Sequence, residues 1–443
     1  MRPRLGSLLL LPMVACLVAA GPAAPAPALS PHDQGEVVAA LTRTLATRYV
    51  FPDVAPTIIA RLDARLRAGA YAGAVDPAAL ARALTDDLIA ASGDLHFAVG
   101  VDPAWVAEVR AEDDPVRRAA SRARVRAEAA ATNFGFESVS RLEGNVGYVR
   151  ATYFADPELG YRAAAAAMRM IEETDAVIFD LRANHGGAME MVQLLASYLL
   201  SAERDQLLFD YYYVQDGRRV ARGQWVLPAV PGPRMLTQPV FILTASTTFS
   251  AAEWFAYVLQ RLGRATVIGA PTGGGAHPVD RVPIDDQFYL QLPIGQIYDP
   301  VDHGDFEGRG VQPDVPVASR TALVVAHRMA LARIAARAPA RAAELAWLEP
   351  VLAARLRPPT LEPAALARLV GNYQGRELTL DDGHLVYHWR GRFRLTLEPL
   401  TPDLFAVEGI DDFRLKVVTA GGKVVGLERI NQTGPSQIYP RRD

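Results

Sequence analysis

Ser250 lies in a stretch where a buried strand, a turn, a helix and a glycine-rich loop are predicted to follow one another. The stretch reads VFILTASTTFSAAEWFAYVLQRLGRATVIGAPTGGGAH, and its helix begins near Ala251. A serine hydroxyl at a helix start lies near free backbone N–H groups and the positive end of the helix dipole, which favour negative charge. Ser250 is therefore a candidate nucleophile. An oxyanion that develops on a substrate during its attack would be stabilised there. Serine is also a preferred N-cap residue, so a purely structural role stays open.

A second strand, glycine turn and helix are predicted in DAVIFDLRANHGGAMEMVQLLASYLL, which starts at Asp175. Gly186 and Gly187 open this helix, and paired glycines can bring exposed amide N–H groups close to a ligand. Two such units favour a parallel α/β sheet whose loops gather at the carboxyl ends of its strands. We therefore expect the backbone N–H groups of Ala251 and of Gly186 or Gly187 to hold the oxyanion formed at Ser250.

Three segments of the chain resemble the signature blocks of the S41 serine peptidases. They read DLRANHGG, TFSAAEWFA with the downstream GAPTGGGAHP, and DFEGRGVQPDVPV. The similarity covers the chain from Asn145 to Val317, extends weakly upstream to His96, and keeps the blocks in the family order. That family includes the C-terminal processing peptidases, the tricorn core protease and the interphotoreceptor retinoid-binding protein repeats. The resemblance implies an α/β catalytic core of the crotonase/ClpP-like S41 fold that hydrolyses peptide or protein substrates through an acyl-enzyme. The stretch between the strand predicted at 145–154 and Asp180 leaves no room for the PDZ domain of the processing peptidases.

The group that activates Ser250 cannot be a lysine of this region, because the first lysine of the chain is Lys416. A Ser–Lys dyad of the kind found in the processing peptidases is therefore excluded. The resemblance to the tricorn arrangement instead implies His96 as the general base and Glu307 as the acid that orients its imidazole. Leu95 precedes His96 where tricorn has a serine, so that auxiliary hydroxyl is missing here.

Two further histidines lie within or beside the signature blocks. His277 follows the glycine-rich loop and is the rival candidate for the base, because that loop is expected near Ser250. His185 lies in the DLRANHGG block and is a candidate for substrate contact. A histidine in such a place can also be a hydrogen-bonded structural residue. The sequence thus leaves the choice between His96 and His277 open.

Other chemistries and partners fit the sequence less well. The H-E-x-x-H and Cys/His spacings of zinc sites and the G-x-S-x-G elbow of α/β-hydrolases do not occur, so neither a metal nor another cofactor is expected. The formal net charge is −3 with the two signs interspersed, which gives no reason to expect a nucleic-acid partner. The alternative to a peptidase is a catalytically idle relative that binds an apolar ligand or a peptide in the same cleft.

The beginning of the chain has the pattern of a secretory signal peptide. Residues 1–28 combine a basic start, an apolar core and small residues, so export to the periplasm or the cell exterior is expected. Cys16, the one cysteine of the chain, is a candidate lipidation site and would be the route to a membrane. The mature chain would then contain neither a disulfide nor a thiol nucleophile.

Three further regions follow the leader. Residues 31–133 show apolar residues at three- and four-residue spacing and are predicted to form a helical domain. Residues 138–345 are predicted to form the catalytic domain. Residues 361–443 alternate with period two, with turn signals at Asp382-Gly383 and Gly421-Gly422, which predicts an antiparallel β domain. No oligomeric state is predicted.

Overall fold

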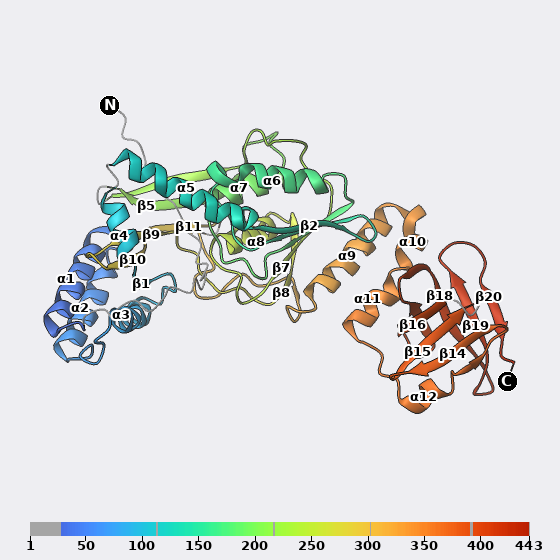
Figure 1. The fold of residues 1–443 in the computed structure, drawn as a ribbon. Coiled ribbons are helices and arrows are strands. Elements are labelled where there is room, and N and C mark those ends of the chain that lie inside the picture. The colour runs from blue at the N-terminus through green and yellow to red at the C-terminus, as the bar shows by residue number, and fades with distance from the viewer. Residues whose placement is uncertain (1–27, 112–113, 216–217, 302, 390–392, 443) are drawn as a thin grey trace. The chain divides into compact units, whose positions relative to one another are not determined.

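The computed structural model describes residues 28–442 apart from 112–113, 216–217, 302 and 390–392 (Figure 1). The chain forms two compact units, and each is described by itself. Unit 1 comprises the residues up to Arg141 and Gly147–Ala322, whereas unit 2 comprises Leu142–Val146 and the chain from Leu323 onward. The predicted signal peptide, except for its last residue, and Cys16 lie outside the described residues.

Unit 1 begins with three helices whose ends follow simple capping rules. Ser30 forms a capping box at the first helix, and the Asp76 side chain accepts a backbone hydrogen bond at the start of the third. Gly93, with φ of 74°, ends the third helix in the left-handed conformation. The chain therefore leaves this helix at a fixed point, three residues before His96. The helices are α1 (Pro31–Arg48), α2 (Ala55–Arg67) and α3 (Pro77–Ser92).

A small antiparallel sheet packs with these helices in one hydrophobic core. Strand β10 lies at its centre and pairs with β1 and β9. Because β1 starts two residues after His96, the pairing of Ala98 with Gln291 helps to fix the position of that histidine. The Gln291 side chain also donates a hydrogen bond of 2.8 Å to the His96 carbonyl oxygen. The strands are β1 (Ala98–Val101), β9 (Val279–Pro283) and β10 (Phe288–Pro293).

The larger sheet of unit 1 has six strands in the order β12-β8-β7-β4-β3-β2. Strand β7 pairs in parallel with both β4 and β8, and β8 pairs in parallel with β12. Every residue of β4 and β7 is buried, as expected for parallel strands that are covered on both faces. The loops that follow β4 and β7 therefore leave the same edge of the sheet, and they carry Gly186 and Ser250. The strands are β2 (Phe136–Leu142), β3 (Val146–Ala151), β4 (Ala176–Asp180), β7 (Val240–Thr244), β8 (Ala265–Gly269) and β12 (Val315–Pro316).

Helices α6, α7 and α8 contribute apolar side chains to the same core as the strands of this sheet. A separate antiparallel sheet in the order β11-β5-β6 completes unit 1. The remaining elements of unit 1 are α4 (Pro103–Arg110), α5 (Pro115–Ala131), η1 (Asn133–Gly135), α6 (Pro157–Ile171), β5 (Leu207–Gln215), β6 (Arg218–Trp225), α7 (Met189–Leu199), α8 (Ala251–Arg261) and β11 (Gly295–Tyr298).

Unit 2 contains an eight-stranded antiparallel sheet whose strands follow one another in chain order. Asp382 and Gly383, with φ of 45° and 79°, join two neighbouring strands, and Gly421 and Gly422 do the same with φ of 56° and 76°. Positive φ at both central residues is the requirement of a type I′ hairpin turn, so these turn predictions are confirmed. The elements are α9 (Ala322–Arg337), η2 (Pro339–Arg341), α10 (Ala342–Ala346), α11 (Glu349–Leu356), α12 (Pro363–Ala367), β13 (Gly371–Asn372), β14 (Arg376–Asp381), β15 (His384–Trp389), β16 (Phe393–Pro399), β17 (Leu404–Val407), β18 (Ile410–Ala420), β19 (Lys423–Asn431) and β20 (Gln437–Pro440).

The structure confirms the coarse fold prediction: a helical N-terminal region, an α/β core with parallel strands and a C-terminal antiparallel sheet. The crotonase/ClpP-like assignment and the domain bounds 31–133, 138–345 and 361–443 stay predictions. Residues 323–345, which we expected in the catalytic domain, lie in unit 2. Within the part of the chain that the structure describes, we find no helix with the length and apolar character needed to cross a membrane.

Candidate active site

Ser250 directly precedes the first residue of α8 and has a strained backbone, with φ of 55° and ψ of −125°. A positive φ is unfavourable for a residue with a Cβ, and such strain concentrates at functional sites. Gly186 packs against this point: a Cβ on Gly186 would lie 2.8 Å from Ser250 Cβ and 3.0 Å from the Ala251 nitrogen. Only a glycine therefore fits at position 186, and the loop after β4 reaches the backbone of the serine.

Glu253 is fully buried one turn into α8 and was not predicted as a site residue. Its carboxylate accepts hydrogen bonds from the backbone N–H groups of Ser250, Gly274 and Gly275, at 2.7 to 2.8 Å, and from the Thr272 hydroxyl. Burial raises the pKa of Glu253, and these hydrogen bonds oppose that effect. All four partners donate, so the contacts stabilise the ionised carboxylate. The sequence signal that could have identified Glu253 is its Ser-x-x-Glu spacing from Ser250, which is typical of a capping box.

We expect Glu253→Gln to lower the free energy of unfolding by about 2 kcal/mol, because a buried donor that loses its acceptor costs about 1–3 kcal/mol. The glutamine amide would direct N–H groups at one or more of the four donors that now face the carboxylate. Urea denaturation followed by circular dichroism measures the change. The matched control is Glu190→Gln, at an exposed glutamate in the first turn of α7, with an expected effect within about 0.5 kcal/mol. Equal stabilities for the two variants would contradict this role of Glu253.

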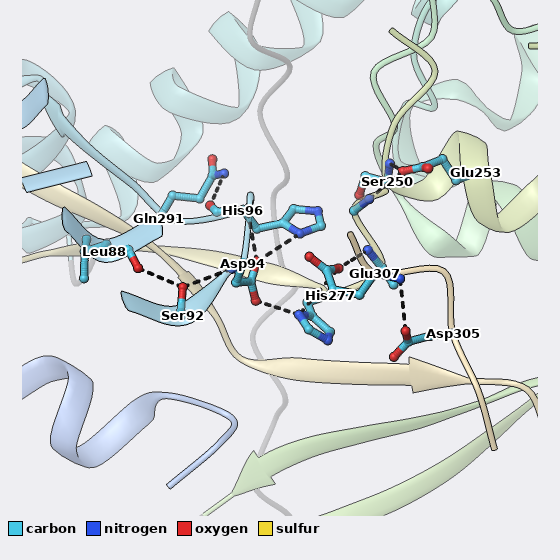
Figure 2. A network of polar contacts seen from close by, with 12 residues as sticks. Leu88, Ser92, Asp94, His96, Ser250, Glu253, His277, Gln291, Asp305 and Glu307 are labelled. Atoms are coloured by element: carbon cyan, nitrogen blue, oxygen red, sulfur yellow. Dashed lines mark hydrogen bonds and ion pairs between the residues drawn. The ribbon is translucent and has the colours of Figure 1, made fainter. Parts of the chain in front are cut away.

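His96 lies against the segments that surround Ser250. Its ring centroid is 4.8 Å from that of Phe249, and a Cβ on Gly275 would lie 2.7 Å from His96 Cε1. The side chain is 3% exposed, and neither ring nitrogen forms a hydrogen bond with any residue that the structure describes. Figure 2 shows the His96 ring between Asp94 and Ser250 in this view. The structure therefore places the predicted base against Phe249, the residue that directly precedes the predicted nucleophile.

Asp94 is the acid closest to His96 and was also not predicted as a site residue. One carboxylate oxygen lies 3.5 Å from His96 Nδ1 and accepts a 2.9 Å hydrogen bond from the His96 backbone N–H. The other oxygen shares a 2.6 Å hydrogen bond with His277 Nδ1. Burial acts to raise the pKa of Asp94, but the contacts with the two histidines hold that pKa well below its usual range. Asp94 is thus a buried, ionised carboxylate between two imidazoles.

His277 and Glu307 form the other side of this network (Figure 2). Glu307 Oε2 lies 3.6 Å from His277 Nδ1 and accepts a 2.5 Å hydrogen bond from the Ala276 backbone N–H. Burial acts to lower the pKa of His277, but the hydrogen bond with Asp94 raises it overall. The pKa of Glu307 is raised by burial, against the attraction of His277. The structure therefore brings Glu307 into contact with the rival histidine, whereas the ring of His96 faces Asp94.

The predicted oxyanion donors are only partly available. Gly186 N–H donates a 2.8 Å hydrogen bond to the Asn184 side-chain oxygen, so the Gly186 alternative is corrected. The N–H groups of Gly187 and Ala251 have no protein acceptor among the residues that the structure describes. Gly187 has φ of 136°, and a Cβ there would lie 2.1 Å from the Phe154 carbonyl oxygen, so glycine is required. Gly187 and Ala251 are the remaining candidate pair.

His185 lies in the same loop as Gly186 but does not join the network. Its side chain is exposed, and its backbone N–H donates to the Thr152 carbonyl oxygen at 3.4 Å. An exposed side chain next to the candidate oxyanion site is compatible with substrate contact, so that role stays a prediction.

Family comparisons support the resemblance seen in the sequence. Residues 145–317 match the family model described as Peptidase family S41. Residues 31–130 match the model described as the N-terminal domain of Peptidase_S41 in eukaryotic IRBP. These two matches include every residue of the candidate site.

Individual relatives are more distant. A carboxy-terminal-processing protease of Bartonella bacilliformis is 27% identical over 184 residues, which cover 40% of each chain. A carboxyl-terminal-processing protease of a Synechocystis species is 27% identical over 177 residues, 40% of this chain and 38% of the relative. The chain thus spans about two fifths of the length of these relatives. A solved lipoprotein structure from Streptococcus agalactiae aligns with a TM-score of 0.45 at 15% identity, covering 71% of this chain and 99% of that one.

Proposed function

Because the chain belongs to peptidase family S41, we propose that it is a serine peptidase that hydrolyses peptide bonds through an acyl-enzyme on Ser250. The observation that carries this proposal is a strained serine at a helix start together with a buried histidine that packs against the preceding residue, Phe249, and faces the carboxylate of Asp94. A nucleophilic serine needs a base of this kind to take its proton. The absence of any lysine before Lys416 leaves histidine as the base.

In the proposed acylation step, Ser250 Oγ attacks the scissile carbonyl carbon while His96 takes the hydroxyl proton. The carbonyl π bond becomes an oxyanion, and the N–H groups of Ala251 and Gly187 donate to it. Each such donor stabilises the transition state by about 3 kcal/mol in comparable acyl-transfer sites. His96 then gives its proton to the leaving amine as the C–N bond breaks. In the second half of the reaction His96 deprotonates a water molecule that attacks the acyl carbon. The ester bond to Ser250 Oγ then breaks, the acid product leaves, and His96 returns the proton to Oγ.

Asp94 takes the orienting role in this proposal, and Glu307 supports it indirectly. The carboxylate of Asp94 is 3.5 Å from His96 Nδ1 and stabilises the imidazolium that forms in each step. His277 holds the second oxygen of Asp94, and Glu307 lies next to His277. This assignment differs from the tricorn-like expectation, in which Glu307 orients His96 directly.

A fluorophosphonate probe tests the proposed nucleophile. Such probes phosphonylate an activated serine, so we expect the wild-type chain to be labelled once and the Ser250→Ala variant not at all. Ser246→Ala, four residues earlier in the loop after β7, is the matched control and should be labelled like the wild type. A folded wild-type chain that stays unlabelled would instead support the idle, ligand-binding relative.

We also propose that the protein is exported, as its leader indicates, and acts on peptides or proteins outside the cytoplasm. Mass spectrometry of the protein from its native host should find an N-terminus within about 30 residues of Met1, the usual length of a signal peptide. A lipid on Cys16 would identify a lipoprotein. An intact leader on the mature protein would contradict export by this route.

A further inference from the structure

Three side chains of the site place potential metal ligands together in a buried position. The ligand atoms of Asp94, His277 and Glu307 all lie within 4.8 Å of one another. They come from the segment after α3, the end of the glycine-rich loop and the loop before β12 (Figure 2). Two of the three residues are buried and Glu307 is half-buried. Among the described residues, this is the group whose geometry can enclose a cation.

We propose that Asp94, His277 and Glu307 form a binding site for a divalent transition-metal cation of the Zn²⁺ class. Imidazole nitrogen and carboxylate oxygen are both ligand types of Zn²⁺, which binds three or four protein ligands. Calcium requires six to eight oxygen ligands, and magnesium retains most of its water, so neither fits a small buried group that includes an imidazole.

The distances suit a cation with short bonds. Zn–N and Zn–O bonds of about 2.0–2.2 Å at tetrahedral angles separate neighbouring ligand atoms by about 3.4 Å. His277 Nδ1 and Glu307 Oε2 are 3.6 Å apart. His277 Nδ1 and Asp94 Oδ2 are 2.6 Å apart because they share a proton. A cation that replaces this proton would need to widen that contact by less than about 1 Å, which side-chain rotation can provide.

A fourth ligand lies beside these three. His96 is 3% exposed, its two nitrogens lack hydrogen-bond partners, and Nδ1 faces the second oxygen of Asp94 at 3.5 Å. A buried polar atom without a partner is unfavourable unless something else satisfies it. One oxygen of Glu307 is likewise buried without a partner. The His96 imidazole and this Glu307 oxygen therefore each have an electron pair available for a cation. This observation is independent of the distances among Asp94, His277 and Glu307.

Further hydrogen bonds hold the backbone at Asp94 and Glu307 and one carboxylate oxygen of Glu307. The Ser92 hydroxyl accepts a 3.0 Å hydrogen bond from the Asp94 backbone N–H and donates to the Leu88 carbonyl oxygen at 2.8 Å. The Ala276 N–H holds Glu307 Oε2, and the Asp305 side chain accepts from the Glu307 N–H at 3.0 Å. Such contacts orient ligands before the cation arrives.

No motif in the sequence indicates this site, and we expected no metal. Motif searches detect ligands at short, fixed spacing, whereas Asp94 and His277 are 183 residues apart. The cation binds and dissociates, and the serine mechanism does not require it.

The expected effect of the cation is inhibition, and this part rests on the proposed peptidase function. A neutral imidazole that binds a cation through Nδ1 carries its proton on Nε2, so His96 could not accept the proton of Ser250. A cation on Asp94 would also remove the charge that stabilises the imidazolium. Cation binding should therefore inhibit the peptidase activity reversibly, and a chelator should restore that activity.

The binding test uses the full chain with Ser250→Ala, so that it does not depend on catalysis. After chelator treatment, CoCl₂ is added and the visible absorption of Co²⁺ is recorded, while calorimetry with ZnCl₂ gives affinity and stoichiometry. We expect one cation per chain and the intense absorption of four- or five-coordinate Co²⁺. Glu307→Gln and His277→Asn should each weaken Zn²⁺ binding by more than the roughly 10- to 100-fold loss caused by removing an outer partner.

The matched control is His32→Ala, which removes the exposed His32–Glu36 pair, whose nitrogen and oxygen are 3.6 Å apart. That variant should keep the affinity and the spectrum. Circular dichroism checks that each variant is folded. Because Glu307→Gln and His277→Asn are tested separately, the result remains interpretable if one of them fails to fold. Loss of binding in His32→Ala with no change in Glu307→Gln and His277→Asn would overturn the proposal, as would the absence of any bound cation.

A second measurement separates this proposal from the proposed function. Fluorophosphonate labelling of the wild type is timed with ZnCl₂ and again after a chelator is added, and the ratio of the two rates is the readout. If a cation binds the Ser250→Ala variant but the wild type is never labelled, the metal site is supported and the peptidase proposal is wrong. If labelling is normal but no cation binds, the peptidase proposal is supported and the metal site is wrong.

Discussion

Replacing His96 with alanine is expected to lower kcat for peptide hydrolysis by a factor on the order of 10⁴ to 10⁶, the range seen when the base of a serine peptidase is removed. Ser250→Ala should have an effect of the same size. The two residues act as one unit, so the double variant should cost little more than either change alone. Initial rates with a fluorogenic peptide that the wild type cleaves provide the measurement, and thermal unfolding checks that the variants are folded.

The matched control for this prediction is His277→Ala. His277 shares a 2.6 Å hydrogen bond with Asp94 and packs against Phe51, whereas the His96 ring packs against Phe249, which directly precedes Ser250. We therefore expect His277→Ala to retain much more activity than His96→Ala. The opposite order would make His277 the base while leaving the serine mechanism intact.

The parts of the fold that depend on local patterns could be predicted from the sequence. Continuous apolar runs such as AVIFD indicated buried strands, and β4 and β7 are buried at every residue. The Asp382-Gly383 and Gly421-Gly422 pairs marked hairpin turns because only certain residues accept positive φ there. Ser250 and its helix start were predicted on the same local grounds.

The network around the histidines could not be predicted, because it depends on segments that are distant in the chain. Asp94 was overlooked although it stands two residues from His96, since nothing in the sequence shows that His277 lies within 2.6 Å of it. Glu253 was not predicted because its role depends on the glycine-rich loop, whose Gly274 and Gly275 N–H groups donate hydrogen bonds to its carboxylate. The resemblance supplied a place for Glu307 but not its partner, which is His277 rather than His96.

Asp94→Asn is expected to lower kcat by a factor of about 10² to 10⁴, by analogy with the loss of the buried acid in serine triads. The pKa of Asp94 lies well below its usual range, so the residue is ionised at neutral pH and its charge stabilises the His96 imidazolium. Asparagine has nearly the same shape but no charge. It would also leave the Nδ1 proton of His277 without its ionised acceptor. KM should change little, because no substrate contact is removed.

Glu307→Gln is the matched control, since it neutralises a second carboxylate in the same cluster. Glu307 Oε2 lies 3.6 Å from His277 Nδ1, whereas the carboxylate in contact with His96 Nδ1, at 3.5 Å, is that of Asp94. We therefore expect a loss of less than about tenfold, comparable to a hydrogen bond of about 1 kcal/mol. Initial-rate kinetics of both variants decides between the two acids. If Glu307→Gln abolishes turnover while Asp94→Asn remains active, then the direct partner of His96 during catalysis is Glu307, and a movement of its loop must bring it there.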